Sequence, residues 1–87
     1  MKILSTAYLI VICNRETNAI EKVAIWSSPE WQQSRQLDQP TYVAYELKAE
    51  TFQKAIDQMC VWIGQKDSRY HYLVKYLEPN LLAKCNG

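Results

Sequence analysis

The sequence predicts an α+β fold, with a small antiparallel sheet of three or four strands and one long amphipathic helix packed on one face. Segments 4–13, 19–26 and 41–48 are rich in β-branched and aromatic residues, which favour strands. Segment 50–63 instead repeats its apolar residues at helical spacing. The 87 residues fit a single domain, residues 1–87, with no repeat or linker.

The first predicted strand, residues 4–13, is apolar on both faces. Tyr8, Ile10 and Ile12 alternate along it with Ala7, Leu9, Val11 and Cys13. Such a strand is normally central in its sheet and covered on both sides. The polar residues 14–18 then form a turn, and residues 19–26 return as the second strand of a hairpin.

A short helix at about 29–37 is predicted next. Ser28 is the expected N-cap, and Pro29 suits the first helical position. Its large apolar residues are Trp31 and Leu37, so the helix has little to bury.

Pro40 ends that segment, and residues 41–48 form the third strand. Strict alternation places its odd-numbered and even-numbered residues on opposite faces. One face would carry Thr41, Val43, Tyr45 and Leu47, and the other Tyr42, Ala44, Glu46 and Lys48.

The helix at 50–63 has the clearest pattern in the chain. A continuous stripe consists of Phe52, Ala55, Ile56, Met59, Cys60 and Ile63. We expect Phe52, Ile56, Met59 and Ile63 to form its buried face. Gly64 is the expected glycine stop just after the helix.

The segment 69–77 has two interpretations. Tyr70, Leu73, Val74 and Leu77 have helical spacing, whereas Tyr70, Tyr72, Val74 and Tyr76 alternate as in a strand. We favour a strand, because tyrosine and valine favour strands and a fourth strand could pair beside the first. The helix stays open as the alternative, and Pro79 closes the segment in both.

The charge of the chain argues against a nucleic-acid partner. Ten Lys and Arg against nine Asp and Glu give a formal net charge of +1, and the cations are dispersed. Nucleic-acid binding needs clustered cations, since neutralised phosphates supply most of the affinity. The surplus of aromatic residues keeps a single-stranded nucleic-acid binder as an alternative.

The three cysteines predict free thiols and a reducing, cytoplasmic location. Cys13, Cys60 and Cys85 lie far apart, and their odd number argues against a disulfide framework. His71 is the single histidine, so no metal site is expected. The apolar run 3–13 follows Lys2 as in a signal peptide, but it offers no small residue for cleavage at Val11 and Ile12 and is too short to cross a bilayer.

Catalytic motifs are weak. A Cys60–His71 or Cys13–His71 dyad would need the fold to bring the two side chains together, as would a pair of carboxylates. Glycines stand only at 64 and 87, which excludes a glycine-rich nucleotide loop. We therefore expect no cofactor, and a small enzyme with a spatially assembled site stays an alternative.

The aromatic surplus favours a non-enzymatic protein-binding module that occupies a partner's surface, a profile common among viral or mobile-element accessory proteins. Tyrosine and tryptophan dominate interface hot spots. The candidate contact residues are Tyr8, Trp26, Trp31, Tyr42, Val61 and Trp62.

A homodimer follows from the strand interpretation of 69–77. The helix 50–63 covers only one side of the apolar strand 4–13, and a fourth strand would extend the uncovered side. With a helix at 69–77, a monomer would suffice.

Overall fold

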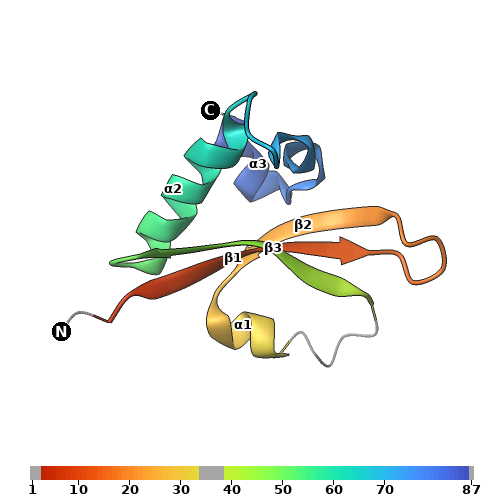
Figure 1. Cartoon of the computed structure of the whole chain (residues 1–87), viewed down its shortest axis with the longest axis horizontal. Coiled ribbons are helices and arrows are strands. Elements are labelled where there is room, and N and C mark those ends of the chain that lie inside the picture. Colours follow the sequence, from red (N-terminus) through yellow and green to blue (C-terminus); the bar gives the residue numbers. More distant parts are fainter. Residues whose placement is uncertain (1–2, 34–38, 87) are drawn as a thin grey trace.

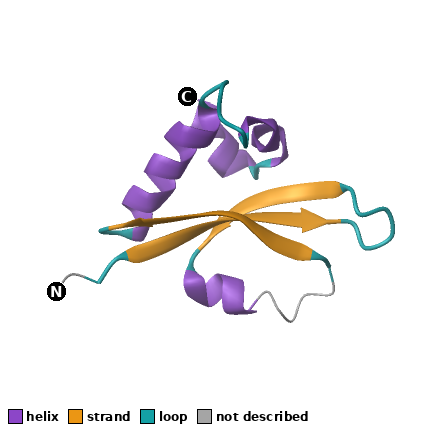
Figure 2. Ribbon diagram, viewed as in Figure 1, coloured by secondary structure: helices purple, strands orange, loops and turns teal. Residues whose placement is uncertain are grey.

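The computed structural model describes residues 3–33 and 39–86 and has the expected α+β architecture. Helices lie on both sides of a twisted antiparallel sheet, with α2 and α3 on one side and α1 on the other (Figures 1 and 2). The elements are β1 (Ser5–Cys13), β2 (Ile20–Trp26), α1 (Ser28–Gln33), β3 (Thr41–Ala49), α2 (Phe52–Gly64), the 3₁₀ helix η2 (His71–Tyr76) and α3 (Pro79–Asn86).

The sheet has three strands in the order β2-β1-β3, so β1 is central as its two apolar faces predicted. The β1–β2 turn is built by asparagines. The Asn14 side-chain oxygen accepts hydrogen bonds from the backbone N–H groups of Glu16 and Thr17. Asn18 has a φ of 61°, a left-handed conformation that asparagine tolerates better than most residues.

A bulge in β3 overturns the strict alternation expected for this strand. Leu9 pairs with Tyr45, but the next residue of β1, Ile10, pairs with Val43, which leaves Ala44 as the extra residue. A bulge of this kind reverses the facing of every residue beyond it. Tyr42 therefore lies opposite Val11, on the same side of the sheet as Tyr45.

The main core lies between the sheet and α2. Thr51 caps α2 by accepting a hydrogen bond from the Lys54 backbone N–H. The fully buried residues of the helix are Ala55, Met59, Cys60 and Ile63. The predicted stripe is thus confirmed at Met59 and Ile63, whereas Phe52 and Ile56 are only half-buried at its border.

Gly64 is not the left-handed stop that we expected. It is the last residue of α2, its φ is not positive, and Gln65 follows as the C-cap with its N–H donated to the Trp62 carbonyl. A glycine is needed here because a Cβ atom would collide with the backbone of Cys85 in α3.

The strand expected at 69–77 is wrong, since residues 71–76 form η2. The helical spacing prevails over the strand preference of tyrosine and valine, because it buries Leu73, Val74 and Leu77 against the core. The segment ends before Pro79, as expected, with Leu77 as the C-cap of η2, and Pro79 itself begins α3. Proline suits the first turn of a helix, where its missing N–H has no partner to lose.

The opposite face of the sheet is also covered. Ile10, Ile12 and Ala24 are buried there, on the side of α1. Helix α1 begins at Ser28, one residue before the expected start, and the Glu30 carboxylate accepts a hydrogen bond from the Ser27 N–H. Part of the predicted helix, including Leu37, lies outside the described residues. Both faces of β1 are therefore covered. The homodimer expected above depended on one uncovered apolar face, and the described residues of β1 offer none.

Candidate interaction surface

Three aromatic rings form a cluster, from Tyr45 of β3, Trp62 of α2 and Tyr70, the residue just before η2. The rings of Tyr45 and Trp62 stack with centroids 4.3 Å apart. Tyr70 packs against both, at 5.9 Å from Tyr45 and 5.0 Å from Trp62. All three side chains are half-buried and pack against the hydrophobic core.

Two further tyrosines lie on the same side of the sheet and are far more exposed. Tyr42 is 47% exposed and Tyr72 is 55% exposed. Partial burial raises the pKa of Tyr42, and the nearby Tyr72 and Cys13 raise it further. Tyr42 therefore keeps its phenol proton, and stays a neutral hydrogen-bond donor, well beyond physiological pH.

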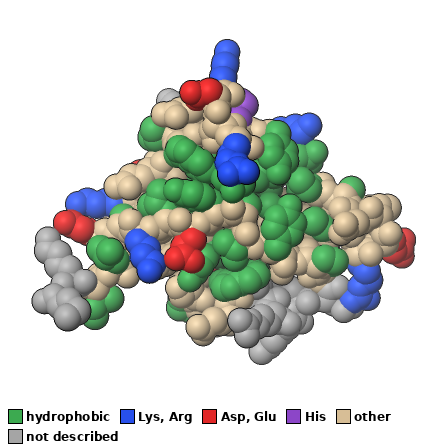
Figure 3. All heavy atoms as spheres, viewed as in Figure 1, with side chains coloured by type: hydrophobic (Ala, Val, Ile, Leu, Met, Phe, Trp, Pro, Cys, Tyr) green, Lys and Arg blue, Asp and Glu red, His purple; other side chains and the backbone are tan. Residues whose placement is uncertain are grey.

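Figure 3 shows the molecule as spheres, in the view of Figure 1. Hydrophobic side chains gather across the centre of the visible face, between the sheet and the helices above it. Exposed aromatic and aliphatic surface of this kind is a common mark of protein contact sites.

The two edges of the sheet differ. At the β2 edge, Val23 forms a parallel bridge with Leu77, and the Lys22 ammonium lies 2.9 Å from the Glu78 carboxylate. The segment between η2 and α3 thus covers part of that edge. Strand β3 lies at the other edge and, within the described residues, pairs only with β1.

A shallow groove of about 520 Å³ separates η2 from α3. Its walls are formed by His71, Tyr72, Val74, Lys75 and Leu82. His71 Nδ1 lies 3.0 Å from the Ile63 carbonyl oxygen, which can only accept a hydrogen bond. This contact places a proton on Nδ1 and orients the ring toward the end of α2.

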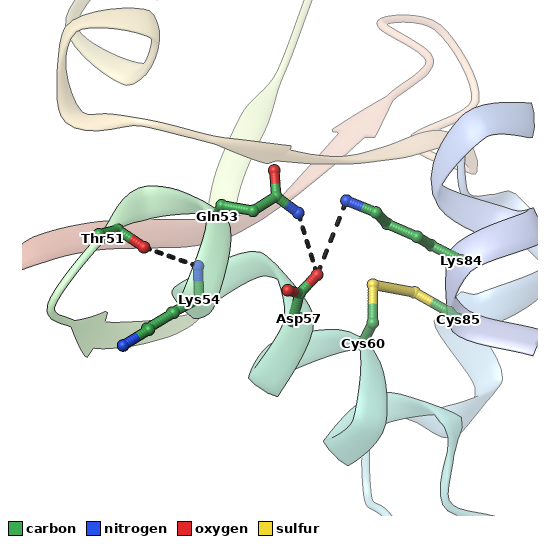
Figure 4. A network of polar contacts seen from close by, with 7 residues as sticks. All are labelled: Thr51, Gln53, Lys54, Asp57, Cys60, Lys84 and Cys85. Carbon is green, nitrogen blue, oxygen red and sulfur yellow. Dashed lines mark hydrogen bonds and ion pairs between the residues drawn. A yellow bond between two sulfur atoms is a disulfide. The ribbon is translucent and has the colours of Figure 1, made fainter.

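A disulfide joins Cys60 of α2 to Cys85 of α3, so the prediction of three free thiols is wrong. The two Cα atoms are 4.6 Å apart. Beside the disulfide, the Lys84 ammonium lies 3.6 Å from the Asp57 carboxylate, which also accepts a hydrogen bond from the Gln53 amide (Figure 4). Cys60 and Cys85 stand 25 residues apart, and only the packing of α3 on α2 brings them together.

The disulfide also removes one catalytic alternative. Cys60 has no thiol to act as a nucleophile, so a Cys60–His71 dyad is excluded in this state of the protein. Cys13 keeps a free thiol but is buried. Among residues 3–33 and 39–86, no group of three or more His, Cys, Asp or Glu could hold a metal ion.

The predicted contact residues fall on separate surfaces. Tyr8 and Trp26 are cross-strand neighbours on the α1 side, both half-buried, and the Ser28 hydroxyl donates a hydrogen bond to that of Tyr8. Trp31 is half-buried on α1. Because of the bulge in β3, Tyr42 lies on the other side of the sheet, the side of α2.

The last two predicted residues lie on α2. Trp62 belongs to the aromatic cluster, and Val61 is 66% exposed on the outer face of the helix. Sequence reasoning missed Tyr45, Tyr70 and Tyr72 as partners of Trp62 and Tyr42. The alternation of Tyr70 and Tyr72 suggested a strand. No local pattern shows that η2 packs against β2 and α2.

No protein-family model, curated protein or solved structure matches this chain. None of the described helices is both long and apolar enough to span a membrane.

Proposed function

We propose that this protein is a non-enzymatic protein-binding module whose contact surface consists of Tyr42, Tyr72 and the outer edge of β3. The observation that carries the proposal is the exposure of two tyrosines, Tyr42 and Tyr72, on the side of the sheet where Tyr45, Trp62 and Tyr70 stack. We call this set the tyrosine surface.

The physical properties of tyrosine support this role. Tyrosine offers a large contact area and a hydroxyl group while losing few rotamers on binding, which is why it is enriched in interface hot spots. The outer edge of β3 has no neighbouring strand among residues 3–33 and 39–86, and an extended segment of another protein can pair with the backbone there. The tyrosine side chains would supply affinity, and backbone pairing at the strand edge would fix the orientation of the bound segment.

The charge distribution supports a protein partner over a nucleic acid. Two cations in this region, Arg69 and Lys75, lie over the rings of Tyr70 and Tyr76. A net charge of +1 offers little neutralisation of phosphates. Membership of a viral or mobile-element accessory class stays a prediction.

Site-specific photocrosslinking in the cells that produce the protein tests the proposal. A photoreactive phenylalanine analogue replaces Tyr72 in one variant, Tyr42 in a second, and Glu16 in the exposed hairpin turn as the control. We expect adducts with protein from positions 42 and 72 and none from position 16. Adducts of equal yield at all three positions, no adducts, or adducts removed by nuclease would contradict it.

The cytoplasmic location also stays a prediction. The Cys60–Cys85 disulfide favours an oxidising compartment instead, since structural disulfides are rare in the cytosol. Trapping thiols with an alkylating reagent at the moment of lysis decides this point. Alkylation of Cys60 and Cys85 before any reduction supports the cytoplasm, and protection of both indicates an oxidising compartment.

A further inference from the structure

We propose that a second copy of this chain pairs antiparallel along the outer edge of β3, with the two-fold axis at Leu47. The dimer would join two three-stranded sheets into one continuous sheet. This inference rests on the proposed function, in which the β3 edge is part of the contact surface. It adds that the protein bound at this edge is a second copy of the chain.

The choice of edge follows from the asymmetry of the sheet. The Val23–Leu77 bridge and the Lys22–Glu78 ion pair occupy part of the β2 edge. The β3 edge, by contrast, runs from Thr41 to Ala49 with no strand beside it in the described part of the chain. An unpaired edge of this length is a template for another strand.

The register follows from symmetry and charge. Residues directly opposite each other in an antiparallel pair point to the same face of the sheet. The two-fold axis must therefore lie beside a residue of β3, because an axis midway between two residues would oppose side chains that point to different faces. An axis at Glu46 or at Lys48 places that charge opposite itself. An axis at Leu47 places each Glu46 opposite the other copy's Lys48, on both sides of the axis.

The charges on β3 thus select one register. Charged side chains on an edge strand usually prevent pairing. Here Glu46 and Lys48 carry opposite signs two residues apart on the same face, with their charged atoms 4.0 Å apart. Self-pairing around Leu47 turns this pair into a square of alternating charges, whereas the neighbouring registers oppose like charges.

The other face is complementary in the same register. Leu47 would lie opposite its own copy, and Tyr45 opposite Ala49, which makes apolar cross-strand pairs on the side of α2. An axis at Tyr45 instead places Glu46 opposite Ala44, in the bulge. The bulge at Ala44 also limits the regular pairing to residues 45–49, a typical strand length.

Charge reversal tests the register. In E46K alone, and in K48E alone, opposite positions in the dimer carry like charges. We expect each variant to raise the dimer dissociation constant about tenfold or more, as for two reversed charge pairs in a sheet. E16K in the hairpin turn changes the net charge as E46K does and should leave the dimer unchanged. Thermal unfolding of each variant verifies that it is folded.

The decisive measurement mixes the two variants. One E46K chain and one K48E chain restore attraction at every opposed position, so the mixture should form a heterodimer of twice the 10.2 kDa chain mass. Sedimentation velocity over a concentration series up to about 1 mM detects it. A wild-type protein that stays monomeric throughout, an E46K variant that dimerises like E16K, or a mixture that stays monomeric would each overturn the register. Crosslinks from position 72 to a different protein would leave the proposed function standing in that case.

Discussion

The carbonyl oxygen of Cys85 lies 2.9 Å from the point that a Cβ atom on Gly64 would occupy. The missing side chain therefore lets α3 approach the end of α2. We expect Gly64→Ala to destabilise the protein by about 1–2 kcal/mol, because overpacking outweighs the better helix propensity of alanine. Urea unfolding measures this loss. The same substitution in a Cys85→Ser background should be nearly neutral, since α3 can then move, and an equal loss in both backgrounds would contradict the steric explanation.

The Cys60–Cys85 disulfide should contribute measurably to stability. Closing a loop between residues 25 positions apart is worth about 3–4 kcal/mol in the chain-entropy model, so Cys85→Ser should lower the free energy of unfolding by a similar amount. Chemical unfolding with and without a reducing agent measures it. The reductant should destabilise the wild type and leave Cys85→Ser unchanged. Titration of the denatured, unreduced protein should find one thiol, that of Cys13, and three thiols would contradict the disulfide.

The buried face of α2 is tested by neighbouring substitutions. Met59 is completely buried, and Met59→Ala should destabilise by about 2–5 kcal/mol, the usual effect of a large-to-small change in a core. Val61→Ala, two residues away on the exposed face, should change stability by less than about 0.5 kcal/mol. Ile56 is half-buried, so its truncation should fall between them. A Val61→Ala loss as large as that of Met59→Ala would show that the outer face of α2 is covered.

Ionisation of Tyr42 should lower the free energy of unfolding at alkaline pH. Its pKa is raised above the ordinary value of 10.0 in the folded protein, so the folded state binds the phenol proton more tightly than the unfolded state does. The corresponding stabilisation is present below pH 10 and is lost as the pH rises through the folded-state pKa. An absorbance titration at the phenolate band, with Tyr42→Phe subtracted, reports this ionisation. Tyr72→Phe should shift the Tyr42 titration toward lower pH, and an unchanged curve would show that Tyr72 does not act on Tyr42.

Much of the fold is predictable because it is encoded locally. The helix over α2 follows from apolar residues at helical spacing, and the hairpin follows from two β-rich segments around an asparagine-containing turn. The central place of β1 follows from its two apolar faces. These properties depend on neighbours within a few positions, which a sequence displays directly.

The tertiary structure alone decides the candidate surface. Ala44 carries no mark of a bulge, yet the bulge moves Tyr42 to the side of Tyr45, where Tyr72 also lies. Cys60 and Cys85 become partners only when η2 and α3 return over α2. The choice between strand and helix at 71–76 depends on whether burial against the core outweighs the strand preference of tyrosine and valine. That balance is set by residues distant in sequence, so local pattern could not determine it.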